Sequence, residues 1–63
     1  MTHREWKAEV EKQLTLRDMT RKELASRIGK SYPRVVAVIA GTARSRIMTA
    51  QISEELGIEP FSE

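Results

Sequence analysis

The sequence predicts an all-α fold, a small four-helix domain in which residues 1–63 form a single unit. Three observations predict this class. Apolar residues recur at helical spacing in four separate segments of the chain. Residues that favour helix starts and stops, such as Thr20 and Gly29, stand at the ends of those segments. Finally, a chain of 63 residues is long enough for only one small hydrophobic core.

The first helix is expected from residue 3 to about residue 16. Trp6, Val10 and Leu14 recur every four residues and form one apolar stripe. Trp6 has the largest apolar surface in the chain, and a tryptophan at this spacing is expected in the core. A short connection follows, with Asp18 as a turn former and Met19 as an apolar residue ahead of the next helix cap.

The second helix is short and begins after Thr20. The Thr20 side chain can cap the helix, and Glu23 three residues later completes the pattern of a capping box. Leu24, Ala25 and Ile28 form its apolar stripe. Gly29 ends the helix because glycine adopts a positive φ at little steric cost.

The third helix is expected over residues 33–40. Pro33 suits a first helical turn and pushes the residue before it out of the helical region. Either Ser31 or Tyr32 is therefore the N-cap. Val35 and Val38 face inward, Ile39 lies at the border of the stripe, and Gly41 ends the helix.

The last helix is expected to begin at Thr49 and to end at Gly57. Residues 42–46 have no apolar periodicity and are predicted to form a loop, after which Ile47 or Met48 re-enters the core. The core expected from all four segments is Trp6, Val10, Leu14, Leu24, Ala25, Ile28, Val35, Val38, Ile52 and Leu56.

Composition narrows the function classes. The chain has no cysteine, so no disulfide or thiolate metal site is expected. His3 is the only histidine and is expected to be solvated, so no metal, no cofactor and no catalytic role is predicted. No apolar run approaches the roughly 20 residues that cross a membrane, and no signal-peptide pattern precedes the first helix. The expected location is the cytoplasm, with no membrane partner.

Positive charge is concentrated in the middle of the chain. The overall charge is +2, yet residues 20–46 hold seven basic residues and one acidic residue. Residues 1–19 are balanced, and the only charged residues in 47–63 are four glutamates. A basic segment that coincides with a pair of short helices is typical of a surface that binds a polyanion.

The segment 20–41 resembles the helix-turn-helix of lambda-repressor/Cro-type (XRE-like) bacterial and phage regulators. The resemblance rests on the spacing of six residues, on the entry into the first motif helix and on the ending of the domain. The six are Ala25, Ile28, Gly29, Val35, Val38 and Gly41, the entry is Met19-Thr20-Arg21-Lys22-Glu23-Leu24-Ala25, and the ending is Leu56-Gly57-Ile58. The resemblance covers roughly residues 5–58 and implies a lambda-repressor-like domain from a phage or mobile element. Its function would be sequence-specific binding of double-stranded DNA, in a repressor or Cro-like regulator at the bacterial nucleoid.

The resemblance also implies the roles of particular residues. Helix 33–40 would enter the major groove, where the positions that match base-facing sites are Ser31, Tyr32, Pro33, Arg34, Val36 and Ala37. The positions assigned to phosphate contacts are Arg21, Lys22, Lys30, Arg44 and Arg46. Arg34 is the one residue of this helix that can form a bidentate pair with guanine, whereas Val36 and Ala37 can contact only thymine methyl groups.

The chain departs from the family in its reading helix, which carries few hydrogen-bonding side chains. Lys30 also replaces the small apolar residue common after the turn glycine. The alternative function is therefore a phage-type modulator or anti-repressor that docks on a partner repressor through Val36, Ala37 and Ile39. Ile58, Pro60 and Phe61 form the only apolar patch expected near the end of the chain, which predicts a weak homodimer or a monomer that pairs on DNA.

Overall fold

The computed structural model describes residues 1–61, which form four α-helices and no strand. The helices are α1 (His3–Leu16), α2 (Arg21–Ile28), α3 (Tyr32–Ala40) and α4 (Arg46–Leu56). The all-α prediction with four helices is therefore confirmed. No helix in these residues is long and apolar enough to span a membrane.

Side-chain caps determine where the first two helices begin. Thr2 and Glu5 form a complete capping box at α1, in which each side chain accepts the other's backbone N–H. The Thr2 backbone N–H, followed by the Thr2 side chain, favours the ionised Glu5 carboxylate and lowers the pKa of Glu5 below its usual value of 4.5. At α2, Thr20 Oγ1 accepts the Glu23 N–H as predicted. The Glu23 carboxylate, however, accepts hydrogen bonds from Arg27, so the expected box is only half formed.

The third helix begins one residue earlier than predicted, at Tyr32. Its N-cap is Ser31, which has extended backbone angles and makes no side-chain capping bond. Pro33 lies in the first turn, where its missing N–H costs nothing. Gly41 ends the helix at a φ of +91°, in the left-handed region that disfavours other residues.

The predicted start of the last helix is wrong. Helix α4 begins at Arg46, because Ser45 is extended and its Oγ accepts the Met48 N–H at 3.1 Å. Arg46 therefore belongs to the first turn of α4 and not to the loop before it. Thr49 lies inside the helix and is buried. Met48 re-enters the core, whereas Ile47 is 69% exposed.

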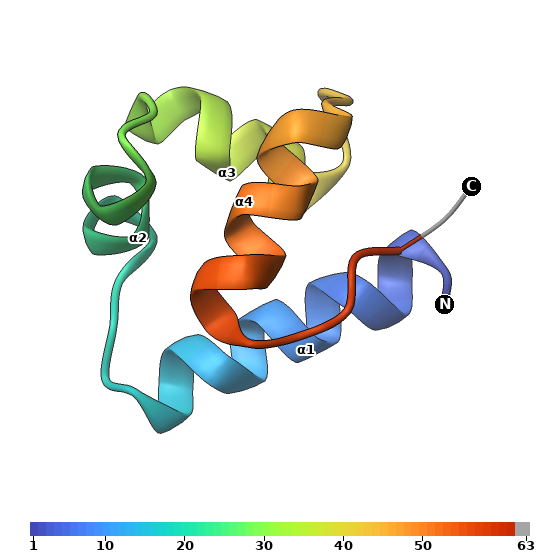
Figure 1. Ribbon diagram of the computed structural model, residues 1–63, viewed down its shortest axis with the longest axis horizontal. Helices are drawn as coiled ribbons and strands as arrows, with labels where there is room; N and C mark the ends of the chain where they lie inside the picture. The colour runs from blue at the N-terminus through green and yellow to red at the C-terminus, as the bar shows by residue number, and fades with distance from the viewer. Residues whose placement is uncertain (62–63) are drawn as a thin grey trace.

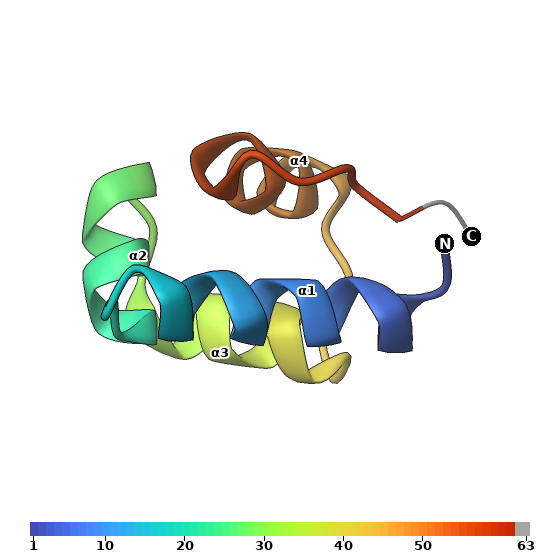
Figure 2. The ribbon, with the colours of Figure 1, turned by 90° about the horizontal axis from the view of Figure 1, so that it is seen from below.

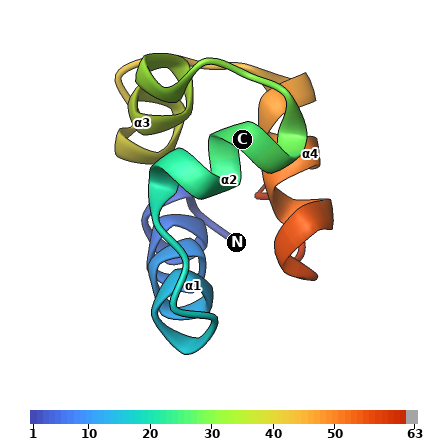
Figure 3. The same ribbon diagram turned by 90° about the vertical axis from the view of Figure 1, so that its left-hand side faces the viewer.

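The helices form two sides of a small bundle. Helices α1 and α3 run in opposite directions along one side, and α4 lies on the other (Figure 1, Figure 2). Helix α2 crosses between them at the end of the bundle (Figure 3). It packs against both α3 and α4.

The core joins all four helices around Trp6, which is fully buried. The indole Nε1–H donates to Ser53 Oγ at 2.8 Å, and that hydroxyl donates to the Thr49 carbonyl at 2.6 Å. Nine of the ten predicted core residues are buried, while Ile28 is half-buried at the core edge. The structure adds three buried apolar residues to the predicted core, namely Met19, Ile39 and Met48.

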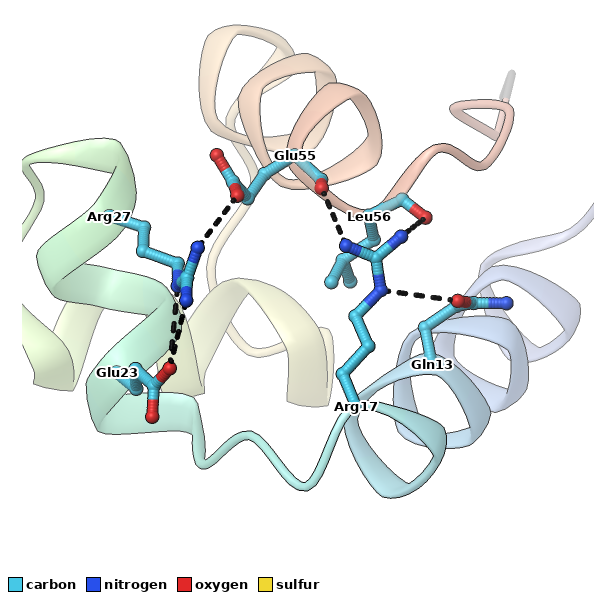
Figure 4. A network of polar contacts seen from close by, with 6 residues as sticks. All are labelled: Gln13, Arg17, Glu23, Arg27, Glu55 and Leu56. Atoms are coloured by element: carbon cyan, nitrogen blue, oxygen red, sulfur yellow. Dashed lines mark hydrogen bonds and ion pairs between the residues drawn. The ribbon is translucent and has the colours of Figure 1, made fainter.

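Two arginines connect helices across the surface, as Figure 4 shows. Arg17, just beyond α1, donates to the carbonyl oxygens of Glu55 and Leu56 at the end of α4. These carbonyls have no partner within the helix, so the guanidinium group caps them. Arg27 on α2 forms ion pairs with Glu23 at 3.2 Å and with Glu55 at 3.6 Å. Both arginines therefore tie α4 to the other helices.

Candidate nucleic-acid interface

The corner between α2 and α3 consists of three residues, 29–31. Gly29 has a φ of +70° and ends α2. The backbone N–H of Lys30 then donates to the Ala25 carbonyl at 3.0 Å, which closes the last turn of α2. Ala25 is buried beneath this corner. The short turn therefore fixes the start of α3 relative to α2.

The predicted base-facing residues lie along the accessible side of α3. Ser31, Pro33 and Arg34 are exposed, and the ring of Tyr32 is 48% exposed. Val36 and Ala37 are half-buried, so each leaves only part of its side chain on the surface. Among the described residues, no hydrogen bond or ion pair holds the Arg34 guanidinium group.

Three predicted contact residues meet at the N-terminal end of α3. Arg21 and Lys22 from the start of α2, together with Tyr32, line a surface cleft of about 660 Å³. The end of α1 forms its other wall. Arg21 is held there by Glu11 of α1, whose carboxylate lies 3.0 Å from the guanidinium group. Lys22 is exposed and makes no ion pair with another described residue.

Two more predicted contact residues lie beyond the C-terminal end of α3. Arg44 and Arg46 line an open groove of about 770 Å³, together with residues of α4 and of the tail. The loop that carries Arg44 is fixed at its start, because the N–H groups of Gly41, Thr42 and Ala43 all donate to the Ala37 carbonyl. Lys30, the fifth residue predicted to contact phosphate, is exposed in the turn before α3.

The predicted cations therefore flank α3 at both ends. Nine helical residues at about 1.5 Å per residue span roughly 13 Å. Figure 2 shows the start of α2 at one end of α3 and the outgoing loop at the other. Arg27, which belongs to the same basic segment, is instead engaged by Glu23 and Glu55 and does not join this set.

His3 is a residue that the sequence reasoning assigned wrongly. It was expected to be solvated, but its ring lies against Trp6 and Phe61, with ring centroids 5.8 and 5.2 Å apart. Its Nε2 lies 3.3 Å from the Val38 carbonyl. A Cβ atom built on Gly41 would approach the ring to 2.9 Å. His3 thus supports the end of α3 and the loop that follows it.

Burial bears on two surfaces that were predicted to contact another protein. Ile39 is 1% exposed, so it cannot dock on a partner as the alternative function requires. Phe61 packs against Trp6 and His3, and Ile58 packs against the core. Ile58 and Phe61 are therefore half-buried, whereas Pro60 is exposed.

Among residues 1–61, no group of three or more histidine, aspartate or glutamate side chains is arranged to hold a metal ion. Comparison with protein-family models, with curated proteins and with solved structures gives no match to this chain.

Proposed function

We propose that this protein is a sequence-specific DNA-binding transcriptional regulator that places α3 in the major groove. The observation that carries the proposal is the distribution of cations around α3. Arg21 and Lys22 lie at its N-terminal end, and Arg44 and Arg46 lie beyond its C-terminal end. A major groove is about 12 Å wide, close to the span of α3, so cations at both ends can reach the phosphates on both sides.

The residues of the interface divide into two kinds by their chemistry. Lysine and arginine at the ends of α3 neutralise phosphates and contribute affinity that does not depend on sequence. Arg34 is exposed in the first turn of α3, where a guanidinium group can donate to O6 and N7 of guanine. The exposed parts of Val36 and Ala37 can contact thymine methyl groups. Sequence preference is thus expected at one guanine and at neighbouring thymines.

The proposed regulator binds as a weak dimer or as monomers that pair on the DNA. Ile58 and Phe61 of the tail are partly covered by the core, which reduces the apolar surface for a stable interface between two copies. Sedimentation of the free protein should show a monomer at micromolar concentration. A tight dimer at nanomolar concentration would contradict this part of the proposal.

The proposal is tested by selecting bound duplexes from a random DNA library and measuring their affinity at several salt concentrations. If five cations contact phosphates, log K should fall with log salt with a slope of roughly −4.5. Arg34→Ala should weaken binding by about 5- to 160-fold, corresponding to about 1–3 kcal/mol, and should remove preference at one base pair.

Two matched variants separate base reading from phosphate binding. Lys22→Gln should weaken binding to all duplexes alike and reduce the salt slope by about one. Lys12→Gln removes the same charge from an exposed position on α1, outside both clefts, and should change little. If the folded protein ignores duplex DNA even at low salt, the proposal is refuted. Specific capture of a repressor protein through Val36 and Ala37 would then favour the docking alternative.

A further inference from the structure

The groove beyond α3 has the size and the lining of a small-molecule site. Its volume of about 770 Å³ falls within the range of roughly 300–1,000 Å³ typical of ligand pockets. Much of its lining is apolar and comes from Val38, Ala43, Ala50, Pro60 and Phe61. A ligand with an apolar body can therefore bury surface there.

The polar groups of the groove favour an anion. Arg46 lines it from the first turn of α4 and makes no ion pair with another described residue. Ser45 and Thr49 add two hydroxyls. No carboxylate stands among the lining residues of the described chain. A negatively charged group on a ligand would complement Arg46.

Contacts within the chain form the walls of the groove. His3 and Phe61 pack edge to face with ring centroids 5.2 Å apart, and both lie against the buried Trp6. On the opposite side, three backbone hydrogen bonds to the Ala37 carbonyl fix the loop. A site that is already formed loses less conformational entropy on binding than a site that must be assembled.

We propose that this groove binds a small organic anion. The ligand has one apolar ring, aromatic or aliphatic, which bears a phosphate, sulfonate or carboxylate group. The apolar body lies between the tail and Ala50, and the anionic group pairs with Arg46. The site is distinct from the proposed base-reading surface, because none of the six base-facing residues lines the groove. It shares only Arg44 and Arg46 with the proposed phosphate contacts.

The test uses phenyl phosphate as the probe and backbone amide NMR signals of the whole chain as the readout. Saturable shifts are expected at groove residues and at the indole N–H of Trp6, which touches Phe61 without lining the groove. Inorganic phosphate lacks the apolar body and benzyl alcohol lacks the charge. Each should bind at least tenfold more weakly than phenyl phosphate.

Three variants make the test specific. Arg46→Gln should weaken phenyl phosphate binding at least tenfold, whereas Lys22→Gln removes the same charge from the other cleft and should leave it unchanged. Ala50→Glu changes an exposed groove residue and should abolish binding by placing a carboxylate beside the anion. The amide spectra of the variants show whether each one folds.

Four results would overturn the proposal. They are equal binding of inorganic phosphate, equal binding of benzyl alcohol, shifts that never saturate, and shifts of groove signals with duplex DNA but not with phenyl phosphate. The last result would make the groove a part of the DNA surface alone. Since the main titration contains no DNA, failure of the DNA-binding function leaves the outcome of this test intact.

Discussion

The hydrogen bond between Trp6 and Ser53 gives the sharpest test of how the core is held together. Both side chains are almost fully buried, and Ser53 Oγ accepts the indole N–H at 2.8 Å. Ser53→Ala removes the acceptor and leaves the N–H without a partner, which costs about 1–3 kcal/mol of unfolding free energy. A domain of this size rarely has more than about 3–5 kcal/mol in total. The variant should therefore lose a large share of its stability.

The measurement is urea denaturation followed by far-ultraviolet circular dichroism, which does not depend on tryptophan fluorescence. Ser26→Ala is the matched control, because Ser26 is exposed on α2 and its side chain makes no hydrogen bond to a described residue. That variant should stay within about 0.5 kcal/mol of the parent protein.

A double-mutant cycle isolates the hydrogen bond itself. Trp6→Phe removes the donor, so adding Ser53→Ala to it no longer strands an N–H group. The two changes together should cost less than the sum of the single changes by about 1 kcal/mol or more. A Ser53→Ala cost below about 0.5 kcal/mol, or additive costs, would refute the view that this bond stabilises the core.

Two further predictions concern the ends of the helices. Gly41→Ala should destabilise the protein more than Gly29→Ala. Both glycines have a positive φ, but only Gly41 also lies against His3. Thermal unfolding of the two variants should therefore give a lower midpoint temperature for Gly41→Ala. The second prediction concerns Glu5, whose pKa is lower in the folded protein than in the unfolded chain. Its bonds to Thr2 therefore stabilise α1 fully above about pH 4.5, and this stabilisation is lost as the pH falls through the pKa of Glu5 in the folded protein. Acid titration of unfolding free energy should show the loss, and Glu5→Gln should remove it; an unchanged profile in Glu5→Gln would contradict the assignment.

Helix positions could be predicted where periodicity and end signals agree. The spacing of Trp6, Val10 and Leu14 placed α1 correctly, and Thr20 with Gly29 gave both ends of α2. The start of α4 was predicted wrongly because Ser45 and Thr49 are both good caps by residue type. Only the extended backbone at Ser45 and its bond to Met48 distinguish them. That information depends on how the preceding loop leaves α3.

The surroundings of the candidate site depended on contacts between distant parts of the chain. Nothing in its local sequence distinguishes His3 from a solvated terminal residue, since its partners lie near residues 38 and 61. The border position of Ile39 on its helix likewise did not show whether it is buried, and the structure places it in the core. The sequence predicted which side chains are charged and where along the chain they cluster, but it did not predict the groove. Its walls come from α3, α4 and both ends of the described chain.

The packing of His3 and Trp6 on Phe61 makes one wall of the groove depend on the tail that follows α4. The hydrogen bond from Trp6 to Ser53 already joins α1 to α4, so losing the tail contact gives up only the interactions of a short segment. Partial opening events should therefore begin there and spread inward. Molecules that have lost the contact between Phe61 and His3 would keep the α2–α3 corner folded but would lack one wall of the groove. Ligand occupancy at the groove would accordingly oppose the earliest step of unfolding.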